Sequence, residues 1–213
     1  MADDISLANF AESVAAATPA PAGGSVAAVC AALAAALTGM VGRVAQARAG
    51  ADTSAGLADL IESADRARGR LLELAGEDAR AFEAVIVARR SAAGTELDRA
   101  DRLAKAWRKA ARVPSDVVLL SRQVAQLARR AAREGPASTL GDAVMAALVA
   151  AATAAGSQVN LRLNVQAAGS PADLRVLVDQ SEVILRETQH AASDTRLAAE
   201  ERLTGPSRPA TEG

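Results

Sequence analysis

Two long uncharged runs constrain what this chain can fold into. They cover Ser25–Gly42 and Ala143–Leu161, which are 18 and 19 residues long. Helices of this length without charge either span a membrane or form the centre of a helical bundle. Both runs are mostly alanine, both contain polar residues such as Thr38 and Thr153, and no basic clusters flank them as topology signals. We therefore expect two buried central helices of a bundle, with membrane spans as the alternative.

The remainder of the chain is rich in the good helix formers alanine, leucine, arginine and glutamate, and lacks the alternating β-branched runs typical of strands. Helix starts are indicated by three capping-box spacings: Thr95-x-x-Asp98, Thr139-x-x-Asp142 and Ser170-x-x-Asp173. Pro114 is expected to break or kink a helix that runs from about residue 96 to 133. The sequence predicts one all-α domain over residues 1–204, a bundle of about six long helices, followed by a disordered tail over residues 205–213.

Alanine also bears on assembly. The chain contains 56 alanines, whose small side chains let helices approach closely but bury little apolar area each. Extra helix partners compensate for a small buried area per residue. We therefore expect an obligate homodimer.

Composition excludes several classes of function. With 24 basic and 25 acidic residues and only three aromatic ones, the chain lacks the basic patch and stacking platforms that nucleic-acid binding requires. One cysteine, Cys30, and one histidine, His190, cannot build a structural zinc site or an internal disulfide. The first residues are acidic, without the cationic start of a signal peptide. We expect a cytoplasmic protein without a metal site or a membrane partner.

The loop from Pro19 to Ser25 is the strongest local feature. Its glycines, Gly23 and Gly24, allow close backbone approach, and the first turn of the following helix offers unpaired N–H groups to an anion or oxyanion. The loop matches neither nucleotide-binding glycine motif, and no strand precedes it. The alternative is a tight turn in which Ser25 caps the helix.

This loop, read as Thr18-Pro19-x-Pro21-x-Gly23-Gly24-Ser25, resembles the cyclodeaminase/cyclohydrolase family. That family comprises the formimidoyltetrahydrofolate cyclodeaminase domain and the bacterial methenyltetrahydrofolate cyclohydrolases. Further similar segments follow in the family's order: Glu77-Asp78-x-x-Ala81-Phe82, Val113-Pro114, Gly141-Asp142-Ala143-Val144 and Asn160-Leu161-x-x-Asn164. The resemblance spans roughly residues 5–200.

The resemblance implies a dimeric all-α enzyme that takes a tetrahydrofolate derivative as substrate and holds no permanently bound cofactor. In cyclodeamination, N10 of the folate attacks the formimidoyl carbon on N5, and ammonia leaves as 5,10-methenyltetrahydrofolate forms. In cyclohydrolysis, water adds to the methenyl carbon and 10-formyltetrahydrofolate forms. The first reaction needs an acid for the leaving ammonia and the second needs a base for water.

Carried over residue by residue, the resemblance implies Asp142 as the acid/base group, at the start of a central helix. Asp78 is a second candidate, for the pterin edge or a proton relay. The other candidates are predicted to bind substrate: Gly23, Gly24 and Ser25 as the backbone wall, Asn160 and Asn164 for the pterin edge, and Arg43 for a carboxylate of the folate tail.

Each candidate also has a structural interpretation. Asp142 can simply complete a capping box, and the two asparagines can hydrogen-bond across the bundle. Asp78 can be a solvated position beside the apolar stripe of its helix, and Arg43 can be a solvated charge. The chain also departs from the family pattern, with Ala22 in place of a glycine and Gly141 in place of a serine. Two alternatives therefore stay open: a diverged enzyme acting on a non-folate amine or amidine, and a non-catalytic helical dimer that serves as a scaffold.

Overall fold

The computed structural model describes residues 6–49, 55–91 and 93–204, and every regular element in these ranges is a helix. The elements are α1 (Leu7–Ala15), α2 (Gly23–Ala49), α3 (Ala55–Arg90), α4 (Glu96–Glu134), the short 3₁₀ helix η2 (Ala137–Thr139), α5 (Leu140–Ala167) and α6 (Ala172–Thr204). The all-α prediction is confirmed. The predicted tail, residues 205–213, lies outside the described residues.

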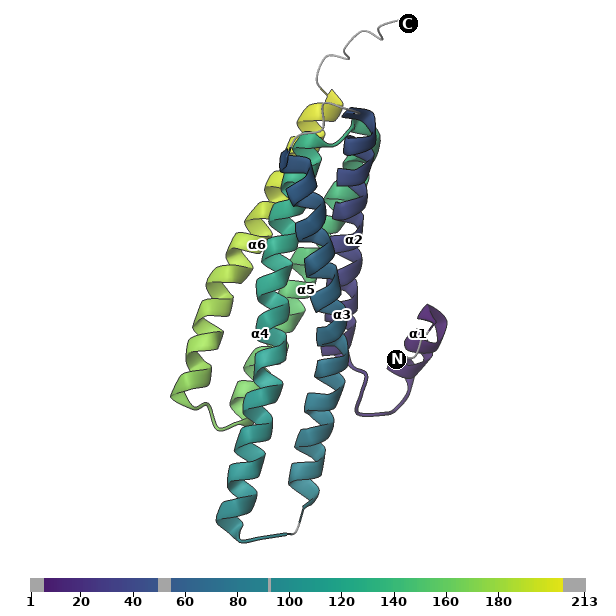
Figure 1. The fold of residues 1–213 in the computed structure, drawn as a ribbon. Coiled ribbons are helices and arrows are strands. Elements are labelled where there is room, and N and C mark those ends of the chain that lie inside the picture. Colours follow the sequence, from purple (N-terminus) through teal and green to yellow (C-terminus); the bar gives the residue numbers. More distant parts are fainter. Residues whose placement is uncertain (1–5, 50–54, 92, 205–213) are drawn as a thin grey trace, which may run out of the picture.

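The five long helices α2 to α6 run side by side as a bundle, whereas the short α1 stands apart from it (Figure 1). The α3–α4 hairpin extends beyond the other helices at one end. The two uncharged runs lie in α2 and α5, where alanine is the commonest buried residue. In their most apolar windows 56% and 44% of the residues are buried inside the bundle, although both segments are long and apolar enough to cross a membrane by length and composition. Both helices therefore contribute to the core.

One of the three expected capping boxes forms. The side chain of Thr95 accepts from the N–H of Asp98 at 3.2 Å, and the Asp98 carboxylate accepts from the N–H of Thr95 at 2.9 Å. The box at Thr139 does not form, because the Thr139 hydroxyl donates to the carbonyl of Pro136 at 3.0 Å within η2. The box at Ser170 was also a wrong prediction: this residue has a φ of 52°, not the extended conformation of an N-cap, and its N–H closes the end of α5.

Of the break or kink expected at Pro114, the break does not occur, since α4 continues through this residue without interruption. A proline inside a helix leaves the carbonyl four residues earlier without its usual donor. In α4 that carbonyl belongs to Ala110, and it accepts a hydrogen bond from α5 instead. Tertiary packing thus supplies the donor that the helix lacks.

Candidate functional site

A cavity of about 360 Å³ lies at the start of α2. Its walls come from segments far apart in the sequence: the loop before α2, one turn of α3, one residue of α4 and the last turns of α5. The lining residues that carry polar or aromatic groups, or that belong to the loop, are Pro19, Ala20, Ala22, Gly23, Gly24, Asp78, Phe82, Trp107, Asn160 and Asn164. A cavity of this size with a few convergent polar groups is typical of a small-molecule site.

The structure brings most of the predicted site residues together here. Gly23, Gly24, Asp78, Asn160 and Asn164 all line the cavity. Ser25 is buried beside it, and its hydroxyl is hydrogen-bonded to the Asp78 carboxylate. These residues were predicted to share one site, and the antiparallel packing of α2 against α5 explains how they meet. The first turn of α2 lies beside the last turns of α5.

Asp142 and Arg43 do not reach this cavity. Asp142 precedes Asn160 by 18 residues on the same helix, and at 1.5 Å per residue that is about 27 Å along the axis. Arg43 follows Gly23 by 20 residues on α2, about 30 Å away, and its guanidinium pairs with Asp65. Because both belong to the far ends of long helices, the expected grouping of Asp142 with the glycine loop does not occur within one chain. The solvated ion pair at Arg43 matches its structural interpretation.

Asp78 is the central polar group of the cavity. One of its carboxylate oxygens, Oδ2, lies 3.1 Å from the Ser25 hydroxyl, which is also 3.0 Å from the carbonyl of Ala75. Burial raises the pKa of Asp78, and the hydrogen bonds from the hydroxyl and main-chain N–H of Ser25 lower it by less. Asp78, on the neighbouring helix α3, therefore accepts hydrogen bonds from the first turn of α2. The sequence had left open that Ser25 caps this helix, but Ser25 lies inside α2.

Gly24 lets this carboxylate approach. A Cβ built on residue 24 would lie 2.2 Å from Oδ1 of Asp78, far inside van der Waals contact. A Cβ on Gly23 would meet its nearest neighbour, Nδ2 of Asn160, at an ordinary 3.7 Å. The two adjacent glycines therefore differ: residue 24 can carry a Cβ only if the Asp78 carboxyl group moves away, whereas residue 23 has room for one.

Trp107 also lines the cavity, although it was not among the predicted site residues. Its side chain is buried, and its indole N–H has no hydrogen-bond partner in the described part of the chain. The guanidinium carbon of Arg89 lies 5.3 Å from the centre of its ring. A buried donor without a partner costs free energy that an acceptor atom of a bound ligand can recover. The sequence offered one signal for this residue, since it is the only tryptophan in the chain.

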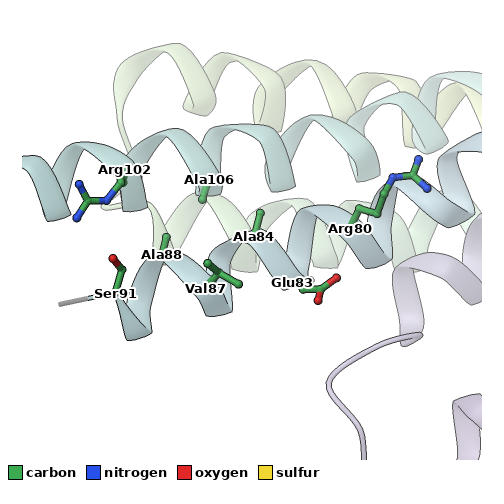
Figure 2. A pocket seen from close by; sticks show the side chains of 8 residues that line it. All are labelled: Arg80, Glu83, Ala84, Val87, Ala88, Ser91, Arg102 and Ala106. Atoms are coloured by element: carbon green, nitrogen blue, oxygen red, sulfur yellow. The ribbon is translucent and has the colours of Figure 1, made fainter. Parts of the chain in front are cut away.

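A second cleft, of about 540 Å³, lies between α3 and α4 near their extended hairpin. Figure 2 shows Arg80 and Arg102 at its two ends, with the small apolar side chains of Ala84, Val87 and Ala88 between them. It contains none of the predicted site residues. Within residues 6–49, 55–91 and 93–204, no group of three or more histidine, cysteine or acidic side chains could hold a metal ion.

Three comparisons with known proteins agree. The sequence profile of the formiminotransferase-cyclodeaminase family matches residues 6–173. A methenyltetrahydrofolate cyclohydrolase from Methylorubrum extorquens is 30% identical over 168 residues, which cover 77% of this chain and 81% of that protein. The formimidoyltransferase-cyclodeaminase of Mus musculus is 34% identical over 167 residues, which cover 76% of this chain but only 31% of the mouse protein.

The fold agrees as well. The crystal structure of formiminotetrahydrofolate cyclodeaminase from Thermotoga maritima superposes with a TM-score of 0.82 at 26% identity, covering 95% of this chain and all of that one. The structural match therefore covers nearly the whole chain. The chain belongs to the formiminotransferase-cyclodeaminase family.

Proposed function

We propose that this protein is an enzyme of folate one-carbon chemistry, which forms or opens the carbon bridge between N5 and N10 of tetrahydrofolate. Two similar proteins are named for such reactions, one a cyclohydrolase and one a cyclodeaminase. The observation that carries the proposal is the half-buried Asp78 carboxyl with a raised pKa, in the cavity wall beside Gly24. A carboxyl of this kind exchanges protons closer to neutral pH than an exposed one does.

Asp78 can serve either reaction as a proton shuttle. In cyclodeamination its protonated form gives a proton to the amino group of the tetrahedral intermediate; the carbon–nitrogen bond then breaks and ammonia leaves. In cyclohydrolysis its ionised form takes a proton from the water that adds to the methenyl carbon, and returns it to N5 as the carbon–N5 bond breaks. The remaining hydroxyl proton is released to water as the formyl carbonyl forms. Each scheme uses the same side chain and no covalent intermediate. This assignment transfers the acid/base role from Asp142 to Asp78.

The test is a direct assay of the full chain with 5-formimidoyltetrahydrofolate and with 5,10-methenyltetrahydrofolate, following the methenyl chromophore. We expect turnover of at least one of them, and the outcome decides between cyclodeaminase and cyclohydrolase. Binding can be followed separately through the fluorescence of Trp107, because this only tryptophan lines the cavity. No turnover of either folate, with no binding by calorimetry, would remove the folate proposal. It would favour the two alternatives, a non-folate amine or amidine substrate or a scaffold.

We also propose that the enzyme is a homodimer through the outer face of α5. Large apolar side chains are exposed on this face at helical spacing, Met145, Leu148, Val159 and Leu163, with 46–57% of each accessible. Ala152 and Gly156, also exposed, lie between them and allow another helix to approach closely. Because Leu163 also lines the cavity, this face reaches the mouth of the site. A second copy of the chain would cover an apolar stripe that a monomer leaves in water.

Sedimentation velocity tests the dimer. We expect the wild-type chain to sediment as a dimer at micromolar concentration, and Leu148→Glu to shift it to monomer because a charge would be buried in the interface. The matched control is Leu97→Glu, an equally radical change at an exposed leucine in the first turn of α4, which should leave the dimer intact. A monomer mass for the wild-type chain at all concentrations would refute the proposal.

The composition of the chain also bears on its localisation, cofactors and partners. We propose a cytoplasmic enzyme without a permanently bound cofactor, a membrane partner or a nucleic-acid partner. The single free cysteine, Cys30, and the near-balanced charge of the chain support this proposal.

A further inference from the structure

Pro114 lies inside α4, opposite the cavity-lining end of α5. Proline has no N–H, so the carbonyl of Ala110, four residues earlier, loses its helical hydrogen bond. Ala110 is 4% exposed, and an unpaired carbonyl at such a buried position is costly. The side-chain amide of Asn164 supplies the missing donor, with Nδ2 2.9 Å from this oxygen.

This bond determines which end of the Asn164 amide faces the cavity. An asparagine amide is nearly symmetric in shape, with a donor at one end and an acceptor at the other, so its orientation depends on its partners. A carbonyl can only accept, so the NH₂ group must face Ala110. Oδ1 then remains for the cavity that Asn164 lines, and in the described ranges it receives no hydrogen bond.

We propose that Pro114 is a positioning residue, which orients Asn164 by leaving the Ala110 carbonyl free. The oriented amide offers the ligand an acceptor, so the atom opposite Oδ1 must be an N–H or O–H donor. The inference deepens the proposed function and rests on it for the ligand: the aminopyrimidinone ring of a reduced folate carries N–H donors along one edge. A ligand edge made only of acceptors would not be selected.

A purely structural role for Asn164 predicts different results, so the test needs two measurements. The first is a double-mutant cycle in urea on the apo protein, with Asn164→Ala in the wild-type and in the Pro114→Ala background. Alanine at position 114 restores the main-chain N–H that donates to the carbonyl of Ala110 in a regular helix. We therefore expect Asn164→Ala to lower the urea midpoint clearly in the first background and by less than half as much in the second. Equal shifts in both backgrounds would overturn the proposed link.

The second measurement is steady-state kinetics with the folate that is turned over. Asn164→Ala should raise KM about tenfold, in line with one lost hydrogen bond. Pro114→Ala leaves the Asn164 side chain in place but unoriented, and should raise KM severalfold while lowering kcat by less. The double variant should match the KM of Asn164→Ala, since an absent amide cannot be misoriented. A wild-type KM for Pro114→Ala would contradict the positioning role.

Asn160→Ala is the matched control, because Asn160 lines the same cavity one turn earlier. Its effects on stability and on KM should add to those of Pro114→Ala rather than depend on them. Non-additivity at Asn160 as large as that at Asn164 would overturn the specific pairing. The urea cycle uses no ligand, so it decides the Pro114–Asn164 link even if neither folate is turned over; that failure would count against the proposed function alone.

Discussion

Replacing Asp78 by asparagine should lower kcat/KM for the folate reaction by at least about 100-fold, the usual contribution of a positioned acid/base group. The amide is isosteric with the carboxylate and can still accept from Ser25, so we expect the helical fold and the proposed dimer to persist. The measurement is the methenyl assay, with circular dichroism and sedimentation as checks of fold and assembly. Activity above a tenth of the wild-type rate would contradict the proton-shuttle role.

Asp142→Asn is the matched control for this experiment. It makes the same chemical change at the first turn of α5, outside the cavity. We expect a rate within twofold of wild type. If Asp142→Asn removed activity and Asp78→Asn did not, the acid/base group would be Asp142, contributed to a site that this chain does not form by itself.

Titration of Asp78 should also make the free energy of unfolding depend on pH. Because burial raises its pKa above the ordinary value of 3.8, the folded chain holds this proton more tightly than the unfolded chain does. Its contribution to the free energy of unfolding is therefore fully present below pH 3.8 and is lost as the pH rises through the folded-state pKa. Asparagine does not titrate. In urea melts, the free energy of unfolding of Asp78→Asn should therefore increase relative to that of the wild type over that same rise in pH.

Substitution of Gly24 by alanine should have the second large effect. A new Cβ would lie 2.2 Å from Oδ1 and 2.5 Å from Cγ of Asp78, so the carboxyl group must leave its place beside Ser25. Replacing glycine by alanine normally stabilises a helix by about 1 kcal/mol, so any net loss in the free energy of unfolding reflects the clash. We expect a loss of about 1–3 kcal/mol in the free energy of unfolding and of more than about 100-fold in kcat/KM. Urea melts and the methenyl assay check the two values.

Gly23→Ala is the control one residue away, where the new Cβ makes only ordinary contact at 3.7 Å. Its stability should equal or exceed that of the wild type, and it should lose far less activity than Gly24→Ala. A second check combines Gly24→Ala with Asp78→Ala, which removes the clashing group. That pair should regain stability but not activity. If Gly24→Ala were as stable and active as Gly23→Ala, the close approach of Asp78 would have no functional importance.

Much of the fold is predictable because its causes are local. Two uncharged alanine-rich runs, strong helix formers and the capping box at Thr95 indicate helices wherever the sequence repeats a 3.6-residue pattern. The wrong expectations arose where a backbone or side-chain group has a hydrogen-bond partner that the local sequence does not indicate. Pro114 does not break α4, because the freed carbonyl of Ala110 finds Asn164 on another helix. The Thr139 hydroxyl finds the carbonyl of Pro136 instead of capping α5.

The sequence by itself determined the helical class and the two core helices, and it indicated the glycine loop as a candidate binding site. Only the tertiary structure decided which acidic residue stands beside that loop. Residues 18 to 20 positions apart on one helix are separated by about 30 Å, whereas an antiparallel neighbour brings residues from distant segments into contact. Asp142 and Arg43 therefore lie far from the site, while Asp78, Trp107 and Asn164 join Gly24 at one level of the bundle.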